Sequence, residues 1–248
     1  MKAIVLCAGI GKRMKPYTET YQKTMIPIQR KPLLEYILNG IKEAGFKNFI
    51  IVVGYLKEQI IEYFKDGSKW DVNIEYIEQK KLNGTGGAVL LCENLIKDNH
   101  FFITWGDILV PYSVYKKVHV IYKNQNHDFI LVTNYMDDPF KGAAVYCEGN
   151  YCCDIIEKPP KDKSVSKLNN CGVLIFSKEI FEVLNKLKPS KRGEIELTEA
   201  ICVGVKERNW KVRVIKMEKN QFRADFGDIK VYEKLKDDSD WLNKIISN

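Results

Sequence analysis

The chain has 248 residues, of which 45% are hydrophobic and 29% are charged, and it carries a formal net charge of +7. This composition supplies a sizeable core and excludes intrinsic disorder, and no apolar run approaches the length that spans a membrane. The positive charge suits an anionic ligand, but it forms no basic patch or tail, so nucleic acid is not an expected partner. Seven cysteines without C-x-x-C spacing, and no signal region before the first strand, predict reduced thiols in a cytoplasmic protein.

The sequence predicts alternating strands and helices up to about residue 135 and shorter strands from Gly142 onward. Strands are expected over residues 3–8, 49–54, 72–77, 101–105, 129–135, 143–147, 152–156, 171–176 and 211–217. Helices are expected over residues 32–44, 57–64, 86–97, 112–123, 178–187 and 194–207, with a last helix from Asp228. The β-α-β alternation predicts a three-layer α/β/α, Rossmann-like fold. Its sheet is mixed and mainly parallel, with ligands at the carboxyl ends of the strands.

The stretch Lys2–Pro32 joins a buried strand to a glycine turn and a group of cations. A surface turn with solvated lysines, a dinucleotide fold and a phosphate-binding loop all compete for it. The dinucleotide pattern G-x-G-x-x-G begins at Gly9 and Gly11 but fails at Met14, and two prolines prevent a long helix from starting at the turn. A phosphate loop is therefore favoured, with cations in place of a helix dipole. The cations are Lys12, Arg13, Lys15 and Lys23.

This stretch resembles the signature of the sugar-1-phosphate nucleotidyltransferases, of the glucose-1-phosphate thymidylyl- and uridylyltransferase type. The matching residues are Leu6–Met14, Pro16, Lys23, Pro27 and Lys31–Leu33. Two positions depart from the pattern: Lys12 stands where Ser or Thr is usual, and Gln22 replaces the proline before Lys23. Neither departure removes an expected charged group. The resemblance implies the nucleotide-diphospho-sugar transferase fold, with Leu6, Ala8, Gly9, Gly11 and Lys12 contacting the nucleotide.

A second glycine-rich segment, Glu78–Ala88, resembles the family's Q-x-x-x-x-G-T motif. By itself it could be a strand-to-helix loop in which Thr85 is the N-cap. The resemblance implies that Gln79 and Gly84, with Thr85, read the nucleobase. A neutral amide offers both a donor and an acceptor, which favours the edge of uracil or thymine and hence UTP or dTTP.

Two acidic residues follow strand ends, at Trp105-Gly106-Asp107 and Ala224-Asp225-Phe226. Asp107 by itself could be an ordinary helix cap. They resemble the family's two carboxylates that hold Mg²⁺, although Arg223 and Ala224 replace the usual aromatic context of the second motif. Carboxylates, phosphate oxygens and water satisfy the octahedral demand of magnesium. Asp228 is expected to cap the last helix and is the second choice of ligand.

The second half of the chain carries matches to the family's sugar-binding motifs. Glu157-Lys158-Pro159 could be an exposed pair before a turn, but it resembles E-K-P, which implies a sugar contact by Glu157 and a phosphate contact by Lys158. Gly142 and Asn170 match two further sugar contacts. Gly193–Glu199 resembles G-E-x-x-L-T-D and is expected to start a helix, with a sugar contact from Glu194 or Glu196 as an alternative.

The resemblance implies transfer of a nucleotidyl group from a nucleoside triphosphate to a sugar 1-phosphate, with Arg13, Lys23, Asp107 and Asp225 as the catalytic residues. We expect one domain over residues 1–248, with a nucleotide-binding half (1–135) and a sugar-binding half (136–248). The alternatives are a cytidylyltransferase acting on a phosphate such as phosphocholine, and a non-catalytic regulatory subunit. A homo-oligomer is left open. No hexapeptide repeats follow residue 228, so no fused acyltransferase domain is expected.

Overall fold

The computed structural model describes residues 1–125 and 127–246. The chain divides into two compact units, each built from separate segments of the sequence. The first unit comprises residues 1–80 and 104–119 and the C-terminal segment from Gln221, and the second comprises 81–103 and 120–220. Strand β6 (His100–Trp105) and helix α5 (Tyr112–Gln125) pass from one unit into the other along the chain. The expected functional halves, divided after residue 135, stay a prediction.

A parallel sheet in the order β5-β4-β1 forms the centre of the first unit. It consists of β1 (Ala3–Cys7), β4 (Asn48–Val53) and β5 (Asn73–Glu78). Helices α2 (Leu33–Glu43) and α3 (Lys57–Phe64) lie between these strands in the sequence. Strands β1 and β4 are buried along almost their whole length, which explains their continuous apolar sequence. Because the three strands are parallel, their carboxyl ends share one edge of the sheet.

The chain between β1 and α2 is a long loop with only short regular elements. It contains 3₁₀ turns at Lys12–Met14 and Lys23–Met25, the one-turn helix α1 (Tyr17–Thr20), and the paired strands β2 (Pro27–Ile28) and β3 (Lys31–Pro32). Among these described residues no long helix precedes α2, as the two prolines predicted.

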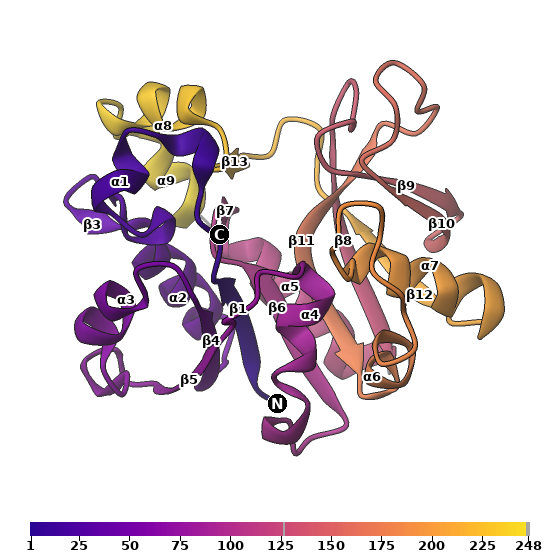
Figure 1. The fold of residues 1–248 in the computed structure, drawn as a ribbon. Coiled ribbons are helices and arrows are strands. Elements are labelled where there is room, and N and C mark those ends of the chain that lie inside the picture. The colour runs from indigo at the N-terminus through magenta and orange to yellow at the C-terminus, as the bar shows by residue number, and fades with distance from the viewer. Residues whose placement is uncertain (126, 247–248) are drawn as a thin grey trace. The chain divides into compact units, whose positions relative to one another are not determined.

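The C-terminal helices α8 (Ile229–Lys236) and α9 (Asp240–Ile246) lie beside this loop (Figure 1). The Tyr17 hydroxyl donates to Glu233 Oε1 at 2.6 Å, and the Tyr232 hydroxyl donates to the Pro27 carbonyl at 3.1 Å. Asp228 caps α8 as predicted, since its Oδ1 accepts from the Lys230 amide at 3.1 Å. The end of the chain therefore braces the loop that carries the predicted phosphate ligands.

The second unit contains a mixed set of strands, in the order β11-β8-β12-β10-β9. An additional pairing between β9 and β11 closes these strands into a ring. Strands β8 and β12 are parallel, and the other pairs among these five are antiparallel. The strands are β8 (Phe129–Tyr135), β9 (Ala143–Glu148), β10 (Tyr151–Glu157), β11 (Leu168–Ser177) and β12 (Val212–Lys216). The helices are α4 (Thr85–Leu90), α6 (Glu179–Leu184) and α7 (Leu197–Glu207).

The predicted α/β architecture with a mixed, mainly parallel sheet is confirmed, but several element bounds were wrong. Helix α4 ends at Leu90, followed by a 3₁₀ turn at Glu93–Leu95, where one helix to residue 97 was expected. Helix α7 begins at Leu197, because the backbone of Ile195 is hydrogen-bonded to Asn83 and Gly86. The last helix is two helices rather than one. None of the helices among the described residues is both long and apolar enough to cross a membrane.

Candidate functional site

Lys23 and Asp107 form an ion pair in the first unit, close to the carboxyl end of β1. The Lys23 ammonium contacts Asp107 Oδ2, and the exposed fractions of the two side chains are only 16% and 20%. The turn that carries Asp107 is fixed by the Gly106 amide, which donates to the Leu6 carbonyl at 3.0 Å. Burial by itself would raise the pKa of Asp107. The charge and hydrogen bond of Lys23 outweigh that effect, so the pKa lies below its ordinary value of 3.8.

Asp225 lies beside Asp107 through a short pair of strands. Strand β13 (Ala224–Asp225) pairs antiparallel with β7 (Ile108–Leu109), and Asp225 stands opposite Ile108. The Phe226 amide donates to the Asp107 carbonyl at 2.9 Å. The Asp225 carboxylate accepts from the Gly227 amide at 2.8 Å and lies 3.7 Å from the guanidinium of Arg223. This small sheet thus brings two acidic positions 118 residues apart in the chain next to each other.

The guanidinium of Arg13 lies over Gly227. A Cβ placed on Gly227 would lie 2.9 Å from Arg13 Nη2 and 2.8 Å from Asp225 Oδ1. The absence of a side chain at residue 227 therefore lets the cation and the carboxylate approach the same point of the backbone. Together with Lys23 and Asp107, these residues form one cluster of two cations and two carboxylates in the first unit. We call Arg13, Lys23, Asp107 and Asp225 the charged cluster.

The glycine turn after β1 adjoins this cluster. Gly11 adopts φ 70°, and a Cβ there would lie 3.1 Å from two carbons of the Lys23 side chain. Gly9 is exposed, with open space where a side chain would be. Leu6 and Ala8 lie on either side of Cys7, the last residue of β1, and Lys12 is exposed. Ala8 approaches Gly54 so closely that a Cβ on Gly54 would lie 2.6 Å from the Ala8 carbonyl oxygen. Backbone groups and cations are thus available at this edge of the sheet.

The residues predicted to read the nucleobase have different surroundings. Gln79 is buried and directly follows β5 in the first unit, and its backbone N–H donates to the Val53 carbonyl at 2.8 Å. Gly84 has φ 96° and forms the N-cap position of α4 in the second unit. The interpretation of Thr85 as the N-cap of α4 was therefore wrong. Its Oγ1 instead accepts from the Leu197 amide at 3.1 Å, which satisfies a free N–H at the start of α7.

Glu157 ends β10 and lies in a network with Arg192, a residue outside the predicted site. The Arg192 guanidinium lies 2.5 Å from Glu196 Oε1, 3.5 Å from Glu157 Oε1 and 3.4 Å from Glu194 Oε2. Thr198 Oγ1 donates to Glu157 Oε2 at 3.0 Å. Burial, followed by the neighbouring charge of Glu196, raises the pKa of Glu157 above its ordinary value of 4.5, although Arg192 and Thr198 act in the opposite direction. The position of Arg192 directly before the Gly193–Glu199 motif was the available sequence signal.

The other predicted sugar contacts lie in the second unit as well. The Lys158 amide donates to the Gly142 carbonyl at 2.7 Å, so these two positions are adjacent, and the Lys158 ammonium lies 3.9 Å from Glu157 Oε1. A Cβ on Gly142 would lie 2.1 Å from Asn169 Oδ1, which explains the glycine. Asn170 is buried, and its Oδ1 accepts from the Gly172 amide at 2.9 Å. Its side-chain oxygen is thus engaged within its own strand.

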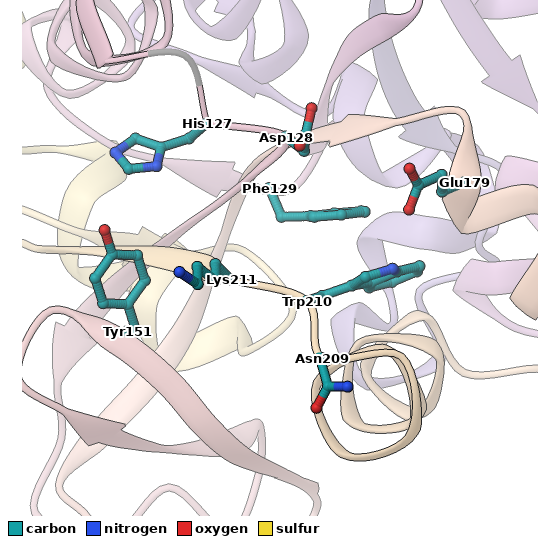
Figure 2. A pocket seen from close by; sticks show the side chains of 8 residues that line it. All are labelled: His127, Asp128, Phe129, Tyr151, Glu179, Asn209, Trp210 and Lys211. Atoms are coloured by element: carbon teal, nitrogen blue, oxygen red, sulfur yellow. The ribbon is translucent and has the colours of Figure 1, made fainter.

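The second unit also contains a cavity of about 290 Å³ (Figure 2). It lies where β8 and β12 begin, and Phe129 and Trp210 stack in its wall with ring centroids 4.1 Å apart. Among the described residues, its lining contains none of the predicted nucleotide or sugar contacts. The lining residues are His127, Asp128, Phe129, Tyr151, Glu179, Asn209, Trp210 and Lys211.

The sequence is similar to those of several known proteins. The sequence profile of the nucleotidyl transferases matches residues 2–240. The chain is 38% identical over 247 residues to a bifunctional protein GlmU of Methanococcus maripaludis strain C7, covering 100% of this chain and 56% of that protein. It is 32% identical over 201 residues to a glucose-1-phosphate thymidylyltransferase of Streptomyces griseus, covering 81% of this chain and 56% of that protein. The chain thus spans about half the length of the curated relatives it matches.

A solved structure of UDP-glucose pyrophosphorylase complexed with UDP-glucose has the same fold, with a TM-score of 0.84 and 26% sequence identity. The match covers 95% of this chain and 97% of that one. The profile and the relatives agree with the resemblance that the loop after β1 indicates. The chain therefore belongs to the nucleotidyl transferase family.

Proposed function

We propose that this protein transfers a nucleotidyl group from a nucleoside triphosphate to a sugar 1-phosphate and releases pyrophosphate. The observation that carries the proposal is the charged cluster, in which Arg13, Lys23, Asp107 and Asp225 gather within one unit. Relatives named as glucose-1-phosphate thymidylyltransferase and UDP-glucose pyrophosphorylase support it.

The proposed reaction needs little covalent help from the protein. An oxygen of the sugar phosphate attacks the α-phosphorus in line, a P–O bond forms, and the bond between the α-phosphorus and the leaving pyrophosphate breaks. The nucleophile is already anionic at neutral pH, so no general base is required. Catalysis is then positioning and neutralisation of charge.

Each cation has a distinct part in this proposal. Arg13 binds the β- and γ-phosphates, because its planar guanidinium suits bidentate contacts with phosphate oxygens. Lys23 neutralises the α-phosphoryl oxygens, and the amides of Gly9 and Gly11, with Leu6, Ala8 and Lys12, line the nucleotide. Lys158 binds the phosphate of the incoming sugar.

Asp107 and Asp225 fit a magnesium ion, because both are hard oxygen donors, Asp225 in β13 and Asp107 directly before its partner strand β7, and Asp107 stays ionised. When bound there, Mg²⁺ would supply positive charge to the α-phosphate and the nucleophile.

The nucleobase and the sugar are read by neutral and acidic groups. Gln79, with Gly84 and Thr85, reads the base, and a side-chain amide favours UTP or dTTP over GTP. Glu157 accepts hydrogen bonds from sugar hydroxyls, and Gly142 and Asn170 complete the sugar contacts. Contacts with Arg192 and with the buried Thr198 hold Glu157 in place for this purpose.

A matrix of nucleoside triphosphates against sugar 1-phosphates, scored by magnesium-dependent pyrophosphate release, tests the proposal. We expect release with UTP or dTTP and at least one hexose 1-phosphate. Phosphocholine with CTP belongs in the same matrix, and activity confined to that combination would overturn the choice of acceptor. No release in any combination would contradict an enzymatic role.

A further inference from the structure

Gln22 connects the end of β1 to the turn that carries Lys23. Its side chain is fully buried, with 0% exposure. Its Nε2 donates to the Cys7 carbonyl at 2.6 Å. Its Oε1 accepts from both the amide and the hydroxyl of Thr24, each at 2.6 Å. One amide side chain therefore ties the last residue of the first strand to the residue that follows Lys23.

The backbone of Gln22 has the conformation of a proline. Its φ is −60° and its ψ is 136°, whereas a pyrrolidine ring fixes φ near −65°. Tyr21, with φ −111° and ψ 141°, also lies in the region open to a residue that precedes proline. The family pattern places a proline at this position. In this chain, hydrogen bonds of the side chain maintain the conformation that a ring would maintain covalently.

The conformation at residue 22 determines where the Lys23 side chain points. Lys23 begins the 3₁₀ turn Lys23–Met25, and the Gln22 Oε1 accepts from the backbone amide of Thr24, the second residue of that turn. The Lys23 ammonium reaches Asp107 from this turn. The backbone N–H of Gln22 also donates to Gln59 Oε1 at 2.8 Å, and Gln59 Nε2 donates to the Thr20 carbonyl at 2.7 Å. Gln59 thus bonds the backbone of Gln22, while the bonds of the Gln22 side chain go to Cys7 and Thr24.

We propose that Gln22 is a positioning residue, whose buried amide locks the Lys23 turn to the end of β1 and so places the Lys23 ammonium for phosphate binding. The inference rests on the proposed function, since that function makes Lys23 a ligand of the α-phosphate.

The test compares Gln22→Met, Gln22→Pro and Gln59→Ala with the wild-type chain. Methionine keeps the volume but removes the hydrogen bonds, and we expect kcat to fall roughly 10- to 100-fold with a much smaller change in KM for the nucleotide, as displacement of a catalytic group predicts. Proline restores the backbone restraint but removes the N–H that donates to Gln59 Oε1, a bond that Gln59→Ala also removes, so we expect its kcat to lie within about threefold of Gln59→Ala. Gln59→Ala is the matched control and should stay within about twofold, because the side-chain bonds of Gln22 remain.

Hydrogen exchange of the segment around Thr24 gives a readout that does not need activity. Loss of the Gln22 acceptor should speed exchange at the Thr24 amide in Gln22→Met and leave it unchanged in Gln59→Ala. Wild-type kcat in Gln22→Met, or equal losses in the methionine and proline variants, would overturn the proposal. If Gln22→Met fails to fold, a folded Gln22→Pro with a tenfold lower kcat overturns it, and near wild-type turnover supports it.

Lys23→Met separates this inference from the function on which it rests. Full turnover in Lys23→Met would remove the proposed role of Lys23 and the inference with it. Loss of turnover in Lys23→Met together with full turnover in Gln22→Met would refute only the inference.

Discussion

Removing the ammonium of Lys23 tests the charged cluster through stability as well as turnover. In Lys23→Met the carboxylate of Asp107 stays in place without its main partner. Breaking one side of a buried ion pair typically costs about 3–5 kcal/mol. Because the side chains of Lys23 and Asp107 are 16% and 20% exposed, water compensates part of the loss. We therefore expect a loss of roughly 2–3 kcal/mol. For a chain of this size that lowers the midpoint of thermal unfolding by roughly 4–12 °C.

The pH dependence of this loss has a definite sign. In the wild-type protein the pKa of Asp107 lies below 3.8, so its contribution to stability is present above that pH and is lost as the pH falls through the folded-state value. In Lys23→Met burial remains while the lysine charge is gone, so the pKa of Asp107 rises. The difference in stability between the two proteins is thus largest near neutral pH and shrinks toward pH 3.8 and below.

Scanning calorimetry at several pH values, beside a pyrophosphate-release assay, measures both effects. Turnover should fall about 100- to 1,000-fold, the range seen when one positioned donor to a transition state is removed. Lys15→Met is the matched control, since Lys15 lies on the same loop, its side chain is 62% exposed, and its ion pair with Glu19 is open to solvent. That variant should lose no more than about 0.5 kcal/mol. Equal unfolding midpoints for Lys23→Met and the wild type at neutral pH, or a difference that grows on acidification, would refute the reasoning.

Three further changes probe other parts of the protein. Glu157→Gln should raise the unfolding midpoint at neutral pH, because the raised pKa means that ionisation of Glu157 opposes folding. The gain in midpoint should shrink as the pH falls toward 4.5. In the same variant, KM for the sugar phosphate should rise about tenfold. Burial raises the pKa of the Cys7 thiol to about 12, so at pH 8 only about one thiol in 10⁴ is ionised. Mass spectrometry after brief iodoacetamide treatment should then find Cys7 unmodified, and alkylation of the native protein at that residue would contradict its burial. Gly227→Ala places a Cβ 2.9 Å from Arg13 Nη2, and we expect at least a tenfold rise in KM for the nucleotide, with little change in unfolding midpoint.

Long apolar runs made most of the fold predictable. The segment Asn48–Val53 reads as a strand because five of its six residues are buried in the centre of a parallel sheet. Strands β7 and β13 were not predictable, since two-residue strands are too short to show a period. They nevertheless bring Asp107 and Asp225 together. The motif order therefore indicated the two acids, while the element that joins them was invisible in the sequence.

Thr85 and Gln22 show a second kind of failure. A threonine before a helix is ordinarily the cap of that helix, but Thr85 binds the amide of Leu197, which is 112 residues away in the chain. Gln22 was only a departure from a pattern in the sequence, yet its side chain is among the most buried polar groups described. Local propensity cannot report a partner that only tertiary packing supplies.

The ion pair between Lys23 and Asp107 also explains how the cluster can be ready before a ligand arrives. A lysine facing an open phosphate site would have many accessible rotamers, and ordering it on binding would cost free energy. Here Asp107 holds the ammonium and Gln22 holds the turn from which it extends. The same ammonium keeps the pKa of Asp107 below its ordinary value, so the carboxylate is charged at neutral pH and can offer its second oxygen to a cation. Asp107 thus holds the ammonium in place, and the ammonium keeps the carboxylate in the ionised state that the proposed reaction requires.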